Sequence, residues 1–421
     1  MRRLLWTIQK GRKMPVVSIF SGSFCRGDEV SEALREATGY SLISDHDVVK
    51  RASVLGAIPE ERLFRCFSAK LSAFNPFTRE LERSLTWIKL SLAEYLQENQ
   101  FILHGFTSHL IPPSISHALH VCLIADLPYR IHDCRQLCDV NHEAAGKRIA
   151  GEDNRKAAWV RLIRETDNPW NPSLYDMVLP TSALGVEKSL SLIKKGILAN
   201  AVVPTEISIG AASLFMEETR IEAALAEKGH VATANANGNQ VTLTIDRPVM
   251  MLERLEEELT PIIKGVSRDY ELTIRVDPKP GKNEIYRKYK DDIPSRVLLV
   301  DDEREFVQTL SERLEMRDIG SAMAYDGESA LEMISEDEPD VMLLDLQMPG
   351  INGMEVLKTV KQTRPEIEVI ILTGHGTQKD RDLCIKMGAF AYLEKPVDID
   401  VLSQTLVRAN KKMRQNRRRE A

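Results

Sequence analysis

Polar side chains follow several short apolar runs in the C-terminal third of the sequence. Asp301 and Asp302 follow RVLLV, Asp345 ends VMLLD, Thr373 ends VIILT, and Lys395 follows AFAYLE. If these runs are strands of one parallel sheet, their carboxyl ends meet at one edge. Clustered carboxylates repel one another, and a hard cation such as Mg²⁺ relieves that repulsion. The set predicts that Asp345 accepts a phosphoryl group, with Thr373 donating to it and Lys395 neutralising it.

The apolar runs also predict the elements that hold these side chains. They contain β-branched residues and leucine without polar alternation, which is typical of strands buried on both faces. Amphipathic stretches of helical period lie between them, through Leu310 and Leu314, through Val356 and Val360, over 383–387 and over 402–407. The alternation predicts a doubly wound α/β domain over residues 295–410.

Four motifs give this domain a family resemblance: DDE at 301–303, DLQMPGINGMEVL from Asp345, LTGHG ending at Gly376, and YLEKP ending at Pro396. Thr373 follows Asp345 by 28 residues, and Lys395 follows 22 residues later. With these motifs, residues 295–410 resemble a response-regulator receiver domain of two-component signalling, which has a flavodoxin-like fold.

The resemblance implies a role for each polar residue. Asp345 would receive phosphate from a sensor histidine kinase or a phosphotransfer protein, and Thr373 and Lys395 would contact the phosphoryl group. Tyr392 would be the aromatic switch, and the Lys395–Pro396 bond is expected to be cis. Mg²⁺ would be held by Asp301, Asp302, Asp345 and the carbonyl of Gln347.

A glycine pair near the N-terminus has the spacing of a phosphate-binding loop. Gly22 and Gly27 follow the strand-like run PVVSIF and precede a helix expected over 30–37. Asp28 stands where the phosphate-binding lysine belongs, and Glu29 where the Mg²⁺-holding hydroxyl belongs. A carboxylate at this helix terminus competes with a phosphate for the same amide groups and repels it.

Basic residues on later helical stretches look like a lid over phosphates: Arg130, Lys147, Arg148 and Arg155. Together with the segment NPSLYDMVLPTS, they make residues 14–204 resemble the cytidylate kinase-like family of P-loop nucleoside monophosphate kinases. The resemblance implies a nucleotide site at Gly22, Gly27, Arg148 and Arg155. It also relates Asp45 to the family's acidic residue near the acceptor nucleotide.

Two positions depart from that family. Asp28 replaces the loop's basic residue, and Phe106 stands where the family usually has an arginine. Losing two cations that neutralise developing phosphoryl charge lowers the rate by orders of magnitude. We therefore expect a degenerate kinase fold that senses a ligand or contacts a protein. The alternative is that Arg26 and the lid arginines still supply enough charge.

Residues 205–277 predict a small α+β module in the order α-β-β-α-β. Helices are expected over 209–228 and 249–264, a hairpin turn at Asn237-Gly238, and a strand over 270–276. The module resembles a BON-like module. A plain interaction or dimerisation unit has nearly the same consequences, so a homodimer is one expected assembly. Residues 278–294 are rich in Pro, Gly and charge and are expected to form a linker.

Charge is unevenly distributed along the 421 residues. Of the formal net charge of −6, residues 295–410 carry −11, and the basic tail 411–421 carries +5. The basic tail raises the hypothesis that the protein is a DNA-binding regulator. No helix-turn-helix pattern accompanies it, so a solvated end is expected and nucleic acid is not an expected partner.

The six cysteines are unevenly spaced, which favours a reducing cytoplasm over a disulfide framework. The N-terminal apolar stretch is too short for a signal sequence. The longest uncharged run, 99–125, contains two prolines and four histidines, which indicates strand, loop and strand rather than a membrane span. The lid also contains a cluster of histidines and cysteines: His132, Cys134, Cys138 and His142. We expect these side chains to serve in packing, and a Zn²⁺ site is the alternative.

Two functions follow from these residues. The first is a response regulator phosphorylated on Asp345, whose kinase-like domain is a sensor or output module. The second is a cytidylate-like nucleoside monophosphate kinase regulated by its receiver. Asp28 separates the two hypotheses, because turnover requires charge that this residue does not supply.

Overall fold

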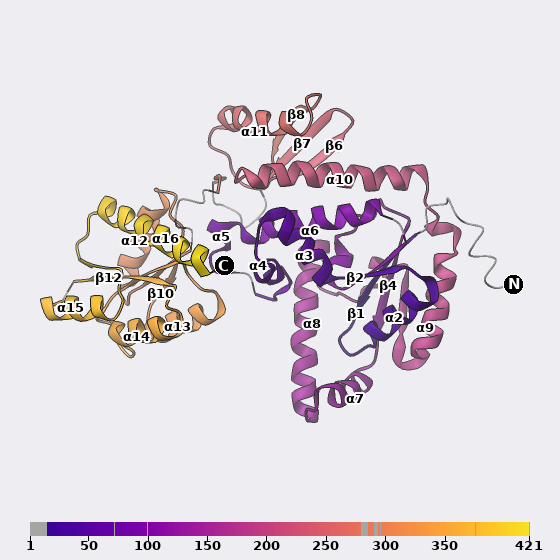
Figure 1. Cartoon of the computed structure of the whole chain (residues 1–421), viewed down its shortest axis with the longest axis horizontal. Coiled ribbons are helices and arrows are strands. Elements are labelled where there is room, and N and C mark those ends of the chain that lie inside the picture. Colours follow the sequence, from indigo (N-terminus) through magenta and orange to yellow (C-terminus); the bar gives the residue numbers. More distant parts are fainter. Residues whose placement is uncertain are drawn as a thin grey trace. The chain divides into compact units, whose positions relative to one another are not determined.

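The computed structural model describes residues 15–70, 72–98, 100–278, 285–289, 294, 296–374 and 376–420. Most of the expected linker and the N-terminal stretch weighed as a signal sequence lie outside these residues. The chain forms two compact units, Met1–Leu71 with Leu81–Tyr286, and Ser72–Glu80 with Arg287–Ala421 (Figure 1).

A parallel five-stranded sheet forms the centre of the first unit. Its strands are β1 (Val16–Ser21), β2 (Ser41–Ser44), β3 (Phe101–His104), β4 (Ala118–Ile124) and β5 (Met177–Pro180). They run in the order β2-β3-β1-β4-β5. The central strand β1 is buried over 16–20, as a strand covered on both faces must be. The strand, loop and strand expected within 99–125 are confirmed as β3 and β4.

Helices connect these strands and cover two separate cores. They are α2 (Gly27–Thr38), α3 (Asp45–Gly56), α4 (Glu60–Phe64), α6 (Glu80–Gln97), α7 (Leu127–Cys138), α8 (His142–Arg164) and α9 (Thr181–Ile197). Short 3₁₀ turns are η1 (Arg65–Phe67), η2 (Phe106–Leu110), η3 (Pro172–Leu174) and η4 (Asn200–Val202). Val17 and Ile19 of β1 face one core, and Val16 and Phe20 face the other. This alternation confirms a doubly wound sheet.

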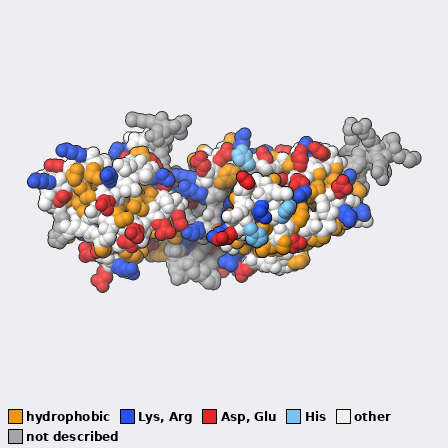
Figure 2. All heavy atoms as spheres, turned by 90° about the horizontal axis from the view of Figure 1, so that it is seen from below, with side chains coloured by type: hydrophobic (Ala, Val, Ile, Leu, Met, Phe, Trp, Pro, Cys, Tyr) orange, Lys and Arg blue, Asp and Glu red, His pale blue; other side chains and the backbone are white. Residues whose placement is uncertain are grey.

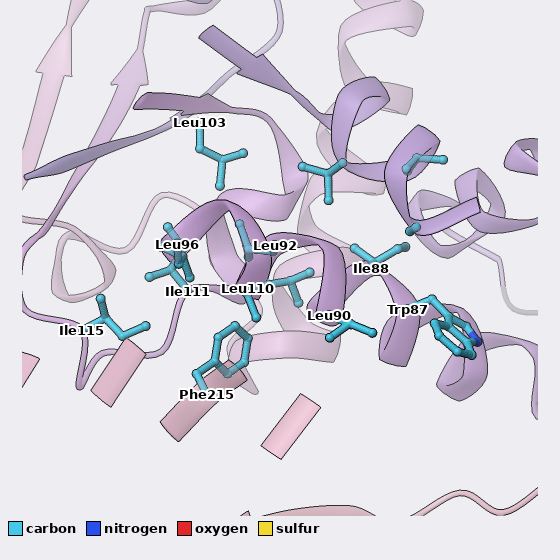
Figure 3. Packing of buried hydrophobic residues seen from close by; sticks show 14 of the residues in the cluster. Trp87, Ile88, Leu90, Leu92, Leu96, Leu103, Leu110, Ile111, Ile115 and Phe215 are labelled. Atoms are coloured by element: carbon cyan, nitrogen blue, oxygen red, sulfur yellow. The ribbon is translucent and has the colours of Figure 1, made fainter. Parts of the chain in front are cut away.

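Two helices of the first unit share one of these cores. Figure 3 shows Ile88, Leu92 and Leu96 of α6 packed with Leu103 of β3, and Phe215 from a different helix beside them. Phe215 belongs to α10 (Glu206–Glu227), the first element after the kinase-like range. The same helix buries its later residues, among them Ile221 and Leu225, under a small second sheet.

That small sheet has the order and elements expected for residues 205–277. Its strands are β6 (Thr233–Asn237), β7 (Gln240–Ile245) and β8 (Glu271–Val276), with α11 (Leu252–Val266) between the last two. The hairpin is confirmed, but the paired residues Asn237 and Gln240 leave Gly238 and Asn239 as the turn. Gly238 has a φ of 58°, a conformation that favours glycine.

The second unit contains a parallel sheet of β9 (Val297–Val300), β10 (Ser321–Ala324), β11 (Val341–Leu344), β12 (Glu368–Thr373) and β13 (Ala391–Glu394). Its order, β10-β9-β11-β12-β13, is flavodoxin-like. The connecting helices are α12 (Arg304–Glu315), α13 (Gly327–Glu336), α14 (Gly353–Thr363) and α15 (Gln378–Lys386), and α16 (Ile399–Glu420) follows the last strand. The expected α/β class at both ends of the chain is confirmed.

Helix α16 continues into the basic tail. Met413 is buried, and the Lys412 ammonium lies 2.9 Å from a carboxylate oxygen of the buried Glu368. The first residues of the tail therefore pack against the domain rather than forming a separate solvated end.

On the face drawn in Figure 2, acidic, basic and apolar side chains are interspersed. Within the described residues, no helix combines the length and apolar character that crossing a membrane requires.

A buried histidine makes the first unit sensitive to acid. His109 in η2 is 4% exposed, its ring centroid lies 4.4 Å from that of Phe20, and its Nε2 lies 3.2 Å from Tyr175 Oη. Burial, with Arg164 and His120 nearby, lowers the pKa of His109 to about 3. The folded state thus disfavours the proton that the unfolded chain accepts below about pH 6.5.

We expect the unfolding free energy of this unit to fall by about 2 kcal/mol between pH 7 and pH 5, because the unfolded state binds more protons in that window. Urea unfolding followed by tryptophan fluorescence measures this unit, since all the tryptophans precede residue 171. His109→Gln should unfold with a weaker pH dependence. An unchanged pH dependence in this variant would contradict the prediction.

Candidate functional site

The carboxyl edge of the second sheet brings together the polar residues that the sequence singled out. Asp301 and Asp302 follow β9, and Asp345 follows the neighbouring strand β11. Carboxylate oxygens of these three residues all lie within 4.8 Å of one another. Thr373 ends β12, and Lys395 follows β13. All five residues therefore lie at one edge of one sheet.

The carboxylate of Asp345 has an unmet need for a partner. Asp345 is 6% exposed, and none of the described residues hydrogen-bonds to its Oδ1. Leaving such an oxygen unpaired is costly in a folded protein. A carboxylate triad with an unpaired buried oxygen fits a hard divalent cation of the Mg²⁺ type. Among the described residues, this triad is the one group of acidic, His or Cys side chains arranged to hold a metal.

Lys395 balances part of the negative charge. Its Nζ lies 2.5 Å from Asp301 Oδ2 and 3.3 Å from Glu303 Oε1. Burial opposes the charge of Lys395, but the hydrogen bond to Asp301 and the charges of Asp301 and Asp345 together outweigh burial and raise the pKa of the ammonium. Burial, together with the nearby Asp345, raises the pKa of Asp301, and Lys395 acts against that shift. The ammonium is therefore held charged beside the triad.

The Lys395 backbone is fixed as well. The Lys395–Pro396 peptide bond is cis, as expected. The Lys395 amide donates to the Thr373 carbonyl at 2.9 Å, which ties the ends of β12 and β13 together.

Tyr392 of β13 points inward. It is 7% exposed and packs in the core formed with α14 and α15. Its hydroxyl is buried without a hydrogen-bond partner among the described residues, and burial raises its pKa. A Cβ added to Gly376 would lie 1.6 Å from the Tyr392 hydroxyl, so the ring lies directly against the loop after β12.

A tight loop carries the chain from Asp345 into α14. The Gly353 amide donates to the Leu346 carbonyl at 3.0 Å, and a Cβ at Gly353 would lie 2.0 Å from the Asp345 carbonyl oxygen. Only glycine allows this approach without moving the backbone of Asp345. Gln347 lies in this loop with an exposed side chain, and its carbonyl as a metal ligand remains a prediction.

The glycine loop of the first unit, residues 22–27, follows β1 and leads into α2. Phe24 and Arg26 have φ values of 61° and 55°, so the loop holds two residues with side chains in a left-handed conformation. Such strain persists only where surrounding contacts fix the loop. Two cations supply those contacts: Arg130 Nε donates to the Ser23 carbonyl at 2.8 Å, and Lys156 Nζ donates to Ser23 Oγ at 2.6 Å.

Lys156 is a cation that the sequence reasoning missed. It lies on α8, beside Arg155, and burial lowers its pKa while Glu152 and Asp153 oppose that shift. Arg130 is occupied by two hydrogen bonds to Asp153, at 2.9 and 2.7 Å. No carboxylate of the described residues lies within salt-bridge distance of Lys156, so its charge remains available at the loop.

Asp28 is paired with a histidine rather than a phosphate. Its Oδ1 lies 3.3 Å from His104 Nδ1, and the His104 Nε2 lies 3.1 Å from Ser21 Oγ. The hydrogen bond with His104, against partial burial, lowers the pKa of Asp28. The carboxylate that replaces the lysine therefore has its own hydrogen-bonding partner, His104, at the end of β3.

Asp45 and Phe106 are joined by a hydrogen bond near the end of β3. Asp45 accepts hydrogen bonds from the Phe106 amide at 2.8 Å, the Thr107 amide at 2.8 Å and the Thr107 hydroxyl at 2.7 Å. Burial raises the pKa of Asp45 in spite of these bonds. Gly105, with a φ of 136°, lets the backbone approach that carboxylate. Asp45 thus holds η2 in place.

The lid residues predicted for the nucleotide site lie on α7 and α8, as expected. The Arg148 guanidinium lies 5.9 Å from the Phe24 ring centroid, and that of Arg155 lies 5.7 Å from the Phe106 ring centroid. Lys147 is exposed and pairs with Glu143 instead. The lid cysteines and histidines do not form a metal site among the described residues, and Cys134 is buried as a packing residue.

Comparison with known families supports both resemblances. Residues 297–407 match the response regulator receiver domain, and residues 16–183 match the cytidylate kinase-like family. Neither match covers residues 205–277, so the BON-like resemblance of the middle module stays a prediction.

Individual relatives match the C-terminal third. The transcriptional regulatory protein CpxR of Escherichia coli K12 is 44% identical over 102 residues, which are 24% of this chain and 43% of CpxR. The response regulator MprA of Mycolicibacterium vanbaalenii is 33% identical over 110 residues, 26% of this chain and 48% of MprA.

Among solved structures, a receiver domain protein from Clostridium thermocellum is 34% identical and covers 28% of this chain and 96% of its own, with a TM-score of 0.28. The chain spans less than half the length of the curated relatives named above. With the carboxylate triad at one end and the glycine loop at the other, the chain joins a cytidylate kinase-like domain to a response regulator receiver domain.

Proposed function

We propose that this chain is a two-component response regulator that is phosphorylated on Asp345 by a partner histidine kinase or a phosphotransfer protein. The observation that carries the proposal is the triad of Asp301, Asp302 and Asp345, with an unpaired buried oxygen on Asp345 and the Lys395 ammonium at its side. The strand ends hold this geometry before any ligand arrives, so little reorganisation precedes phosphoryl transfer.

Four of the chain's residues would hold Mg²⁺ in this proposal. Asp301, Asp302 and Asp345 supply carboxylate oxygens, and the Gln347 carbonyl is a fourth ligand by resemblance. When bound, the ion neutralises charge on the transferred group. The Thr373 hydroxyl and the Lys395 ammonium hold the phosphoryl oxygens. Tyr392, already packed inward, responds to movement of Thr373 and changes the surface around β13.

Phosphorylation at Asp345 can be tested with a small-molecule phosphodonor. Wild-type protein with acetyl phosphate and Mg²⁺ should gain one phosphoryl group in intact-mass measurements, and Asp345→Asn should gain none because the nucleophilic carboxylate is lost. Chelation with EDTA should abolish the modification in the wild type, because the triad then repels the incoming phosphoryl group.

Asp326→Asn is the matched control. Asp326 is an aspartate of the same unit that caps α13 through its Oδ1, and asparagine preserves that bond. This variant should be phosphorylated as the wild type is. Undiminished phosphorylation of the Asp345→Asn variant would refute the assignment of the acceptor.

We further propose that the kinase-like domain binds a nucleotide phosphate at the loop of residues 22–27 and acts as a sensor or output module. The observation that favours it is the Lys156 ammonium on Ser23, which places a cation at the loop from α8 instead of from position 28. The middle module, BON-like by resemblance, would serve as an interaction unit. A receiver-regulated nucleoside monophosphate kinase is the alternative that turnover would support.

Nucleotide binding should raise the thermal stability of the first unit. A ligand at about 100 times its Kd adds about 2.7 kcal/mol, measured in the full chain by tryptophan fluorescence with CMP, CDP or ATP. Lys156→Met should weaken binding by about tenfold or more, because a charge-assisted hydrogen bond is lost. Lys188→Met changes an exposed lysine on α9 that lies outside the lid, and this variant should bind as the wild type does. Equal effects of the two substitutions would speak against a role for Lys156, and phosphoryl transfer from ATP to CMP would favour the kinase alternative.

A further inference from the structure

A short segment from within the kinase-like range belongs to the compact unit of the receiver. Residues Ser72–Glu80 fall inside the match at 16–183, yet they form one unit with Arg287–Ala421. The segment contains one short helix, α5 (Asn75–Thr78), and its last residue begins α6. We call it the docking segment.

Phe74 anchors the docking segment in the receiver core. Its side chain is 0% exposed and packs in the cluster that contains Leu298, Ile334 and Met342. The Arg296 guanidinium lies 5.3 Å from the centroid of its ring. A fully buried phenylalanine contributes more to an interface than most other contacts can.

Arg296 forms the polar part of the same attachment. It is 5% exposed and donates to Glu80 Oε2 at 2.8 Å, to the Glu338 carbonyl at 3.1 Å and to the Asp337 carboxylate. The Ser72 hydroxyl also donates to Asp337. Glu80 and Ser72 thus complete a buried charge network, and their loss would leave buried charges with fewer partners.

Shape complementarity at a glycine adds a third contact. A Cβ added to Gly320 would lie 2.2 Å from the Cβ and Cγ of Phe77, and the three nearest atoms that it would meet all belong to Phe77. The backbone before β10 therefore accepts the docking segment only because residue 320 has no side chain.

The receiver residues that contact Phe77, Ser72 and Glu80 lie before the amino ends of strands. Arg296 precedes β9, Gly320 precedes β10, and Asp337 precedes β11, whereas Asp345 follows β11. The docking segment therefore occupies the edge of the sheet opposite the phosphorylation site and leaves that site accessible.

We propose that the amino edge of the receiver sheet is a binding surface for a segment that supplies two phenylalanines and a glutamate, and that its occupant is Ser72–Glu80 of the same chain. The expected linker at 278–294 is then not the sole tie between the receiver and the kinase-like sequence. The docking segment continues directly into α6, whose later residues pack in the core of the first unit.

Hydrogen exchange of the full chain, read by mass spectrometry, tests the anchor. Phe74→Ala should speed exchange by about tenfold or more in receiver peptides covering 318–322 and 334–340, because the loss of a buried aromatic ring favours local opening. Phe64→Ala is the matched control, because Phe64 packs in the core of the first unit. It should leave those receiver peptides unchanged. Unchanged exchange in the Phe74→Ala variant would overturn the proposal.

Gly320→Ala tests the same contact by changing the receiver instead of the docking segment. It keeps the proposal testable if Phe74→Ala fails to fold. Gly320 is not among the glycines with a positive φ, and the three atoms nearest to the added methyl group all belong to Phe77. We expect faster exchange in peptides covering 72–80 and 334–340, with tryptophan fluorescence of the first unit unchanged. Unaltered exchange over 72–80 would show that the segment does not lie on Gly320, and the proposal would fail.

Discussion

Like-charge crowding at the carboxyl edge of the receiver sheet is the constraint on which the site depends. Two unit charges 4 Å apart repel by about 4 kcal/mol at the dielectric typical of a protein surface. The fold tolerates three carboxylates there because each follows or ends a strand whose apolar residues are buried on both faces. Lys395 offsets part of the repulsion through its ion pair with Asp301. One buried oxygen of Asp345 still has no hydrogen-bond partner among the described residues. The domain is thus poised to bind positive charge.

The kinase-like domain uses the same arrangement of strand ends for different chemistry. Its loop lies at the carboxyl end of β1, and its expected lysine is replaced by Asp28. Two residues from elsewhere in the domain change the electrostatics of the loop: His104 at the end of β3 pairs with Asp28, and Lys156 on α8 reaches Ser23. Charge lost from one loop position is supplied by elements far away in the sequence.

The sequence was sufficient to predict the structure where a reactive side chain lies within a few residues of the end of a strand. The receiver fold and the placement of its five polar residues at strand ends depend on local patterns, whereas the cis bond before Pro396 was expected from the family resemblance. The sequence was insufficient for β10, whose residues SAMA include no β-branched residue and only one large apolar side chain, and for α13, which follows β10. The role of Lys156 also escaped, since a lysine on a helix is ordinarily a solvated residue and only the tertiary fold brings it to Ser23. The docking segment depends on pairing across more than 200 residues, as between Ser72 and Asp337, which no local pattern encodes.

The docking segment has a consequence for synthesis of the chain. During translation the kinase-like domain emerges first and can form its core, whereas the surface that receives Phe74 is not complete until the receiver strands have been made. At about 5–20 residues per second, the ribosome needs roughly 15–65 s to pass from the docking segment to the end of the receiver. Phe74 and Phe77 stay without their final partners throughout that interval, so the nascent chain presents a short aromatic segment next to a folded domain. Burial of these two aromatic rings is therefore completed only when the receiver folds.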